Sequence, residues 1–370
     1  DLSGVQVRDA VTATLPPGTR LRPGERLVLA ADPAALAARY RGVSVDAAYD
    51  GQLANSGERI RVVDAAGGTL LDVTYDDEGA WPLAPDGLGF SLVLDDLAAD
   101  PRDPESWRAS AAAGGSPGAV DPPPPYAGDV VLSEVLANSD PPFEDAIELR
   151  NASADPAAWA DVSGWYLSDD RDEPRKFRIP DGTRLAPGGF AAFYERDFRA
   201  LAPPGRDFGL SADGETVYLM SADAAGAPTG YFHGLSFGAT DPGGSAIRVR
   251  HAAGPDVAPA VAPTFGVDEP ESVEAFRAGR GAPNAPPLVG PVVISEIHAL
   301  PRAGAPAFVE LLNASTEPVA LGGDPDARTG PWALIEGVEL VFPDGALLPA
   351  GGIAVAGGLE PSVLREALAL

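Results

Sequence analysis

The sequence Val130-Val-Leu-Ser-Glu-Val135 is followed by Ile147-Glu-Leu-Arg-Asn151, and the same pair of blocks returns later in the chain. The second copy reads Val292-Val-Ile-Ser-Glu-Ile297 and Val309-Glu-Leu-Leu-Asn313. In each copy the two glutamates are fourteen positions apart. Short alternating runs of this kind predict β-strands. Because the recurrence spans about 160 residues, far more than a solenoid or propeller period, it indicates a tandem array of whole domains.

Two further blocks recur in the same order. Asp161-Val-Ser-Gly-Trp-Tyr-Leu-Ser-Asp-Asp170 has a counterpart in Asp1-Leu-Ser-Gly-Val-Gln-Val-Arg-Asp9. A Pro-Gly turn block occurs three times, at 15–24, 179–188 and 342–351. We therefore expect the chain to begin inside one repeat and to stop inside another.

Two proline-rich stretches, 121–126 and 281–291, each stand directly before a predicted strand. Proline favours extended backbone, so both stretches are expected to be linkers. They predict three domains. Residues 1–125 form a repeat without its first strands, 126–289 a complete repeat, and 290–370 the N-terminal part of a third repeat.

The complete repeat is expected to be an antiparallel β-sandwich, because many short strands alternate with turns rich in glycine and proline. The fold class is therefore all-β, with one complete and two truncated domains. Strands are expected near 130–136, 145–150, 164–168, 176–180, 189–194, 215–220, 230–237 and 246–250. Short helical turns are expected at Pro33–Tyr40, Arg196–Leu201 and Pro361–Leu368.

Composition narrows the possible partners. The 370-residue chain has 54 acidic and 26 basic residues and a formal net charge of −28. Binding to a phosphate backbone needs Lys and Arg, so nucleic acid is not an expected partner. No apolar run approaches the roughly 18 residues of a membrane-spanning helix, so membrane insertion is not expected. The absence of cysteine excludes disulfides and thiolate catalysis.

These blocks, taken in order, resemble the lamin tail domain, the immunoglobulin-like module of nuclear lamins and of many bacterial surface and secreted proteins. The resemblance includes two Gly-Glu-x-[Val/Ile] strands, at Gly57–Ile60 and Gly214–Val217. The first repeat also has a family-like ending, in the blocks Gly87–Leu92, Trp107–Ser110 and Gly115–Gly118. The middle repeat departs there: it keeps Gly243–Ile247 and Gly281–Asn284 but has no matching Trp.

The resemblance implies tandem immunoglobulin-like sandwiches from a secreted or cell-surface bacterial protein, located outside the cell. It favours a non-enzymatic spacer or interaction module with a protein or polysaccharide partner that the sequence does not identify. No heptad rod is present, so the resemblance does not imply a nuclear filament. The alternative is an accessory region of a secreted hydrolase or nuclease whose catalytic domain lies outside this fragment. Strand exchange between the truncated end repeats is a further expectation.

No catalytic residue is predicted. Gly234-Leu-Ser-Phe-Gly238 matches a nucleophile elbow, but Ser236 aligns with Thr74 on an ordinary strand and no helix pattern follows. Glu134 and Glu148 have the spacing to meet on neighbouring strands, as do Glu296 and Glu310 in their copy. A structural role for both pairs is preferred over cation binding or acid-base hydrolysis.

The remaining polar patterns also have ordinary interpretations. The histidines, His233, His251 and His298, lack metal-ligand spacing and are read as strand-face or solvated side chains. Asn151-Ala-Ser153 and Asn313-Ala-Ser315 match the glycosylation pattern, but Asn as the turn residue that ends a strand is preferred.

Acidic loops carry the one cofactor hypothesis. Calcium binds six to eight oxygens, and Asp169, Asp170, Asp172 and Glu173 lie together in one predicted loop. Two similar acidic loops are expected at 76–78 and 140–145. Because no calcium-binding consensus is present, a solvated acidic loop remains the preferred reading. Apart from this possible Ca²⁺, no cofactor is predicted.

Overall fold

The computed structural model consists of two compact units, Asp1–Pro286 and Pro287–Leu370. The boundary falls inside the second predicted linker. The chain is built mainly from antiparallel strands, which confirms the all-β class. The boundary predicted at residue 125 stays a prediction. The structure describes residues 1–124, 129–200, 204–251, 254–266, 270–288, 290–299, 306–323, 331–335, 339–359 and 362–364.

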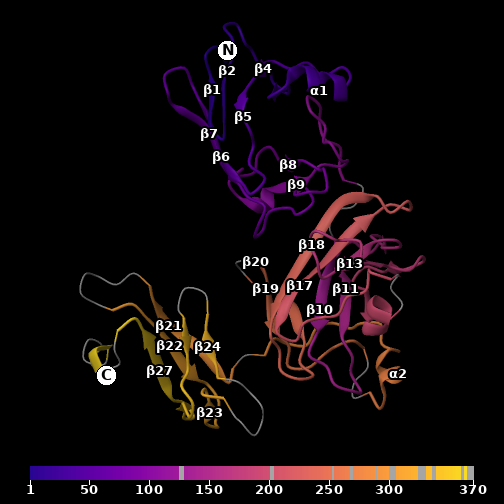
Figure 1. Cartoon of the computed structure of the whole chain (residues 1–370), viewed down its shortest axis with the longest axis vertical. Helices are drawn as coiled ribbons and strands as arrows, with labels where there is room; N and C mark the ends of the chain where they lie inside the picture. Colours follow the sequence, from indigo (N-terminus) through magenta and orange to yellow (C-terminus); the bar gives the residue numbers. More distant parts are fainter. Residues whose placement is uncertain are drawn as a thin grey trace. The chain divides into compact units, whose positions relative to one another are not determined.

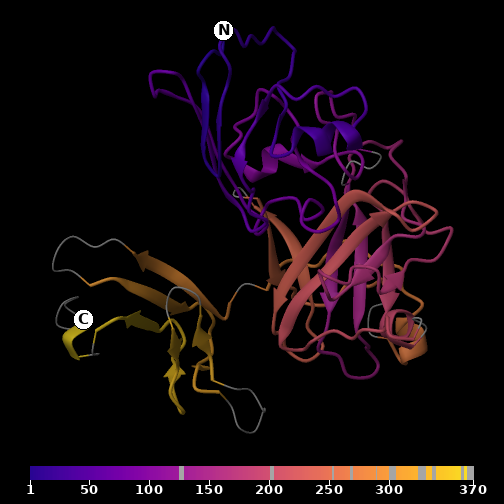
Figure 2. The same cartoon turned by 45° about the horizontal axis from the view of Figure 1, so that its top comes forward.

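The middle repeat is a sandwich of two sheets (Figures 1 and 2). The β10 sheet has the order β16-β11-β10-β19-β20, from β10 (Val130–Leu136), β11 (Ala146–Asn151), β16 (Phe190–Tyr194), β19 (Ala246–His251) and β20 (Gly254–Pro259). The β17 sheet has the order β14-β13-β17-β18, from β13 (Tyr166–Ser168), β14 (Phe177–Arg178), β17 (Gly214–Ala222) and β18 (Pro228–Gly238). A two-strand ribbon adds β12 (Ala160–Asp161) and β15 (Arg184–Leu185).

The core lies between these sheets because alternate side chains of each strand point inward. Ile147 and Leu149 come from the β10 sheet, and Leu167 and Leu219 come from the β17 sheet. All four are fully buried. The period-two pattern of the sequence therefore places these apolar side chains between the two sheets.

A β-bulge at Ser133 adjusts this alternation in β10. Leu132 pairs with Leu149 and Glu134 pairs with Glu148, which leaves Ser133 as the extra residue. A bulge shifts the facing of the residues that follow it. Leu132 and Val135 therefore both reach the core, although they are three positions apart.

Several expectations need correction. β20 was not predicted, because its prolines, Pro255 and Pro259, argue against a strand. It is an edge strand, where proline is tolerated. The helix α2 (Val273–Phe276) was also not predicted. The turn expected at Arg196–Leu201 is the short π-helical segment η2 (Arg196–Ala200). Most of the turn expected at Pro361–Leu368 lies outside the described residues.

The first repeat has a five-stranded sheet of order β5-β2-β1-β6-β7, from β1 (Gln6–Asp9), β2 (Val11–Thr14), β5 (Asp50–Gly51), β6 (Glu58–Val63) and β7 (Thr69–Tyr75). β8 (Leu92–Leu94) pairs with β9 (Trp107–Ala109) in a separate ribbon, preceded by the 3-10 turn η1 (Pro104–Ser106). One parallel pair, β3 (Leu29–Ala30) with β4 (Ala47–Ala48), departs from the antiparallel expectation.

The helix α1 (Pro33–Arg39) confirms the turn expected at Pro33–Tyr40. It begins there because Asp32 caps it: the Asp32 Oδ1 accepts hydrogen bonds from the N–H groups of Ala34 and Ala35, each 3.0 Å away. Proline at the first helical position suits a site where no N–H partner is needed.

Within unit 1 the first and middle repeats share a small apolar cluster. Phe90 and Ala109 of the first repeat pack with Tyr166, Met220 and Phe232 of the middle repeat. Their burial removes apolar surface from water, which stabilises the contact.

Arg171 adds polar links between the same two repeats. Its guanidinium lies 2.6 Å from the Asp86 carboxylate and donates to the Asp77 carbonyl oxygen at 2.8 Å. Direction-dependent bonds of this kind restrict the rotation that an apolar contact alone would allow.

Unit 2 repeats the beginning of the middle repeat. Its main sheet has the order β21-β22-β27, from β21 (Val292–His298), β22 (Phe308–Asn313) and β27 (Ile353–Gly357). Two ribbons pair β23 (Val319–Ala320) with β26 (Leu347–Leu348) and β24 (Ala333–Leu334) with β25 (Leu340–Val341). Glu296 pairs with Glu310 after the same bulge. In the described residues of the chain, no helix is long and apolar enough to cross a membrane.

Candidate functional site

A buried pair of carboxyl groups is the most unusual feature of the middle repeat. Glu134 on β10 stands directly opposite Glu148 on β11. Both side chains have no exposed surface, although they point away from the apolar core. Like charges directly opposite each other on neighbouring strands are destabilising, so this arrangement needs compensating partners.

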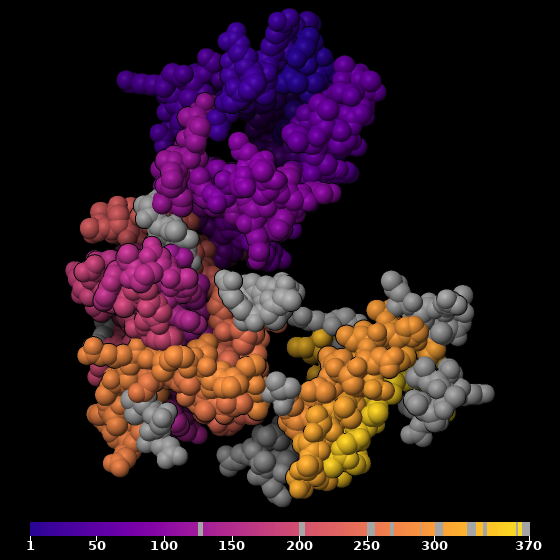
Figure 3. Space-filling view, turned by 180° about the vertical axis from the view of Figure 1, so that it is seen from behind, coloured from indigo at the N-terminus to yellow at the C-terminus, as the bar shows by residue number. Residues whose placement is uncertain are grey.

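The partners come from a segment that we call the strap, residues 260–266 and 270–284. It follows β20 and lies across the outer face of the β10 sheet; Figure 3 shows the surface of this region in orange. Phe265 and Phe276 of the strap pack against Leu136, Ala146 and Tyr194 of the sheet. The two carboxyl groups are therefore enclosed between sheet and strap.

Glu134 is well supplied with hydrogen-bond donors. Its Oε1 accepts from the Ser245 hydroxyl at 2.5 Å, and its Oε2 accepts from the Thr264 hydroxyl at 2.7 Å. The Thr264 N–H adds contacts of 3.0 and 3.1 Å to the two oxygens. Such bonds favour the charged form of a carboxyl group.

Glu148 has fewer donors. Its Oε2 accepts from the Ala282 N–H at 2.9 Å, whereas its Oε1 is buried and has no hydrogen-bond partner among the described residues. Burial, followed by the charge of Glu134, raises the pKa of Glu148 to about 9. Burial also raises the pKa of Glu134, against the effect of Ser245 and Thr264. Burial and mutual repulsion therefore favour a proton within the pair, and the smaller number of donors at Glu148 favours its neutral form over that of Glu134.

Further bonds close the strap. The Ser133 hydroxyl donates to Asn284 Oδ1 at 3.0 Å, and Asn284 Nδ2 donates to the Ser133 carbonyl oxygen at 3.1 Å. At the other end, Arg277 makes two bonds of 2.7 Å to Glu144. The carboxyl pair is thus part of a closed structural junction, in which neither glutamate has any exposed surface.

The structure brings these two glutamates together, as the spacing predicted. Their bonds to backbone N–H groups agree with the preferred structural interpretation. The sequence did not reveal the strap, although the block Gly281–Asn284 was noted. Ser245, Thr264 and Arg277 were missed, because each lies more than a hundred residues from its partner.

In the acidic loop, two of the four candidate calcium ligands, Asp169 and Asp170, already have partners. Asp169 lies 2.5 Å from the Lys176 ammonium group. Asp170 accepts hydrogen bonds from the N–H groups of Asp172 and Glu173, at 2.8 and 3.3 Å. Within the described residues, no group of three or more His, Asp or Glu side chains is arranged to hold a metal ion. The calcium hypothesis stays a prediction.

The other two acidic loops also have internal partners. In the loop at 140–145, Glu144 is bound by Arg277, and Asp145 accepts from the Ser139 hydroxyl at 2.7 Å. In the loop at 76–78, Asp76 accepts from the N–H groups of Asp77 and Glu78. Asp76 and Asp145 therefore stabilise their own loops, whereas Glu144 binds the loop at 140–145 to the strap.

Ser236 lies on β18 and shares a 2.7 Å hydrogen bond with Thr216 on the neighbouring strand. This placement confirms the prediction that Ser236 is an ordinary strand residue. His233, on the same strand, lies 3.1 Å from Arg248. Burial, followed by the Arg248 charge, lowers the pKa of His233 to about 3, so it stays neutral at physiological pH.

The other two histidines lie on different strands. His298 ends β21 and contacts the Phe308 ring, whose centroid is 5.4 Å away. His251 ends β19.

Asn151 and Asn313 each end a strand. This agrees with the turn-residue interpretation, which was preferred to glycosylation. Both side chains are fully buried. Asn151 Nδ2 donates to the carbonyl oxygens of Ala158 and Leu185, and its Oδ1 accepts from the Ser153 N–H. Asn313 makes the corresponding bonds in unit 2. A glycan would require this amide to be exposed.

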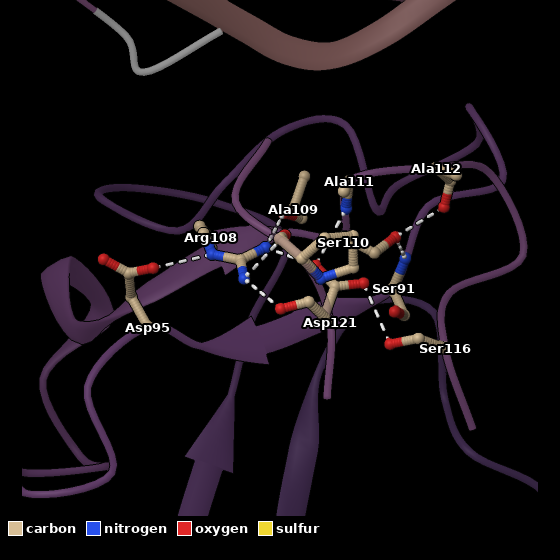
Figure 4. Close-up of polar contacts among 10 residues, drawn as sticks. Ser91, Asp95, Arg108, Ala109, Ser110, Ala111, Ala112, Ser116 and Asp121 are labelled. Atoms are coloured by element: carbon tan, nitrogen blue, oxygen red, sulfur yellow. Dashed lines mark hydrogen bonds and ion pairs between the residues drawn. The ribbon is translucent and has the colours of Figure 1, made fainter. Parts of the chain in front are cut away.

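The first repeat contains a polar node that the sequence did not predict (Figure 4). Arg108 on β9 lies 2.6 Å from both Asp95 and Asp121. Asp121 also accepts from the Ala111 N–H at 3.0 Å and from the Ser116 hydroxyl at 2.9 Å. Although Asp121 was assigned to a linker, its side chain is only 5% exposed, so it anchors the repeat.

A groove of about 470 Å³ lies beside this node. It runs between β8 and the segment 114–119, and Tyr40 of the first repeat also lines it. Asp121 belongs to its wall, and Arg108 compensates that charge. The residues that line the groove do not indicate a particular small molecule.

The two facing antiparallel sheets and their inward alternation define an immunoglobulin-like β-sandwich. Residues 123–231 match the family model of the Lamin Tail Domain, so this stretch of the chain is a lamin tail domain, and the resemblance is confirmed there. This family consists of non-catalytic modules that suit structural or binding roles. No curated protein and no solved structure matches the chain significantly.

Proposed function

We propose that the chain is a non-enzymatic structural and interaction region of a secreted or cell-surface protein. Its repeats act as a spacer that holds other parts of the protein apart and offers strands and loops to a partner. The partner class is a protein or a polysaccharide.

The observation that carries this proposal is the joint between the first and middle repeats. The apolar cluster around Phe90 and Met220 is reinforced by Arg171, which binds both Asp86 and Asp77 of the first repeat. A flexible linker alone would leave the repeats free to reorient. A joint with both apolar and directional polar contacts transmits position along an array, as a spacer requires.

The closed carboxyl pair also supports a structural role. A hydrolase needs its acid and base within reach of substrate and water. Glu134 and Glu148 instead bind strap groups and have no exposed surface. The net charge of −28 suits a soluble surface exposed to solvent.

The joint can be tested by spin-label distance measurements, because the chain has no cysteine of its own. Labels attached at Arg20→Cys and Ala224→Cys report on the two repeats, and both positions are exposed. We expect a narrow distance distribution that broadens when Arg171→Ala is added. Arg178→Ala is the matched control, because it removes an exposed ion pair inside the middle repeat. A broad distribution in the unmodified joint would contradict the spacer function.

Catalysis and location need separate tests. Hydrolysis of glycans, esters or nucleic acid by the purified chain, lost in Glu134→Gln, would overturn the non-enzymatic assignment. Antibody labelling of intact producing cells tests the location, and labelling only after lysis would contradict it. The coding sequence on either side of residues 1–370 tests the alternative, since a neighbouring catalytic domain would make this region an accessory arm.

A further inference from the structure

The block Gly234-Leu-Ser-Phe-Gly238 leaves part of the outer face of β18 without large side chains. Leu235 and Phe237 belong to the sandwich core and are 1% and 7% exposed. Because side chains alternate along a strand, Gly234, Ser236 and Gly238 lie on the opposite, outer face. Glycine weakens a strand interior and often marks a place where a ligand or another backbone approaches closely. The spacing that resembles a nucleophile elbow therefore indicates a surface for contact.

Two residues of β17 extend this surface. Thr216 pairs with Ser236, and Tyr218 pairs with Gly234. The hydroxyl groups of Thr216 and Ser236 share their 2.7 Å hydrogen bond at the surface. A Cβ atom on Gly234 would lie 3.3 Å from both the Thr216 methyl group and the Tyr218 ring, so glycine keeps the space beside this ring open. We call Thr216, Tyr218, Gly234, Ser236 and Gly238 the β18 strip.

The corresponding face of the first repeat is charged. Asp72 and Arg59 stand at the positions of Gly234 and Thr216. They form an ion pair across β6 and β7, in which Arg59 is 50% exposed and Asp72 is 38% exposed. Charged side chains are the usual occupants of a solvated surface. The β18 strip has no charged member, so exposure to solvent alone does not account for its composition.

The β18 strip lines a groove of about 1040 Å³ inside unit 1. The first repeat contributes another part of the lining, from Asp77–Leu83 and from Glu105. Glu78 and Glu105 are exposed, and Asp77 is half-buried. Pockets for small molecules usually measure roughly 300–1,000 Å³. This groove therefore has room for several linked rings.

The chemistry of the lining narrows the occupant. An anionic polymer is repelled by the three carboxylates and by the net charge of −28. Among the residues of β17 and β18, no large apolar side chain is exposed, whereas protein interfaces depend on such anchors. A neutral molecule with many hydroxyl groups suits the whole lining. Its hydroxyls can donate to the carboxylates and bond with Thr216 and Ser236, and its C–H surface can pack against the Tyr218 ring.

We propose that the β18 strip is the binding site of a neutral polysaccharide. One sugar ring packs beside Tyr218, over the space that Gly234 leaves open. Neighbouring sugars bond with the Thr216 and Ser236 hydroxyls and donate hydrogen bonds to the carboxylates of the first repeat. This inference rests on the proposed interaction role and selects a polysaccharide over a protein as the partner.

Affinity electrophoresis of the full-length chain in native gels tests the proposal. Each gel contains hydroxyethyl cellulose, xyloglucan, mannan or soluble starch, and polygalacturonate is the anionic comparison. We expect at least one neutral polysaccharide to retard the chain, and polygalacturonate not to do so, because like charges repel. Ser236→Arg should weaken the binding about tenfold, because the longer side chain occupies the strip.

Thr74→Arg is the matched control. Thr74 is the exposed residue of β7 that aligns with Ser236, and the substitution adds the same charge. This variant should bind as the unmodified chain does. The proposal is overturned if no neutral polysaccharide retards the chain, if only polygalacturonate does, or if the two arginine variants respond equally.

Hydrogen exchange of the unmodified chain covers the case in which Ser236→Arg disturbs folding. Oligosaccharides cut from the retarding polysaccharide should slow exchange in peptides that contain residues 216–218 and 234–238. Peptides that contain residues 72–74 of the first repeat should not change. Slower exchange confined to other segments would place the binding site elsewhere and overturn the proposal.

The binding site and the spacer function can fail separately. The gels and the exchange rates report on the β18 strip, whereas the spin-label distances report on the joint between the repeats. A narrow distance distribution without polysaccharide binding would leave the spacer function standing and overturn the binding site alone.

Discussion

Glu134 lies directly across from Glu148 on antiparallel strands, and neither side chain has any exposed surface. Glu134 receives its hydrogen bonds from Ser245 and Thr264, and Glu148 receives one from the Ala282 N–H. Two buried carboxyl groups in this position compete for one proton. The strap that encloses them is therefore coupled to pH.

Glu148→Gln should stabilise the middle repeat at pH 8, by an amount on the order of a few kcal/mol. The pKa of Glu148 is about 9 in the folded chain, above its ordinary value in the unfolded chain. The folded state therefore binds more protons between these values, and stability falls as pH rises through that window. Urea denaturation from pH 4 to pH 10 measures this slope, which the amide should flatten. Glu310→Gln, in the uncovered counterpart pair, is the control and should leave the slope unchanged.

Asn151→Ala should destabilise unit 1 by about 2–3 kcal/mol, because it leaves buried backbone groups without partners. The amide binds the carbonyl oxygens of Ala158 and Leu185 as well as the Ser153 N–H. Chemical denaturation followed by tryptophan fluorescence measures the loss. Asn138→Ala is the milder control, since among the described residues that side chain makes one hydrogen bond, to the Thr240 carbonyl oxygen. Equal losses in the two variants would contradict the assigned role.

Arg108→Ala should destabilise the first repeat more than Asp121→Asn does. Removing Arg108 leaves a nearly buried carboxylate without its ion pair, whereas the amide keeps a hydrogen-bonding side chain. Burial would raise the pKa of Asp121, but the bonds from Arg108, Ala111 and Ser116 outweigh it and lower the pKa. This carboxylate therefore contributes stability above its unfolded pKa, and the contribution is lost as pH falls through the lower folded pKa.

Hydrogen exchange of the first repeat at pH 7 and pH 3 checks both points about this node. The wild-type chain should lose protection at the lower pH, and Asp121→Asn should lose less. Arg102→Ala is the control, because its ion pair with Asp100 is largely exposed. If the order of the two node variants were reversed, the assignment of Arg108 as the anchor would fail.

Millimolar calcium should leave the melting temperature of the chain unchanged, and so should EDTA. The Lys176 ammonium group already lies 2.5 Å from Asp169, and Asp170 binds backbone N–H groups of its own loop. Lys176→Ala removes this internal cation and should create a calcium-dependent rise in the melting temperature, because Asp169 and Asp170 then lack their counter-charge. A rise in the unmodified chain would show that the acidic loop binds calcium without this change.

Much of the middle repeat could be predicted from its sequence. Ala146-Ile-Glu-Leu-Arg150 alternates cleanly and forms β11, and Asn151 ends that strand as expected. The reason is local: period-two alternation and turn residues act over a few positions. β20 was not predicted, because its two prolines argue against a strand although they are tolerated at the edge of a sheet.

The polar junctions could not be predicted in the same way. Thr264 meets Glu134 across 130 positions, and Arg277 meets Glu144 across 133. The sequence indicated that Glu134 and Glu148 meet, because two adjacent strands suffice for that. It did not indicate that they are covered, because the cover comes from a segment with no repeating pattern.

The paired-glutamate block occurs in the middle repeat and again in unit 2. Comparing the two copies separates what the local sequence determines from what tertiary packing determines. By itself, the sequence determined that Glu134 meets Glu148 and that Glu296 meets Glu310, since strand pattern, bulge and register are local and the same in both copies. Only the tertiary structure decided that the first pair is buried, which raises the pKa of both carboxyl groups, while Glu296 is exposed. Burial depends on what packs over a strand. The strap supplies that cover in the middle repeat, and no described segment of unit 2 does so for Glu296.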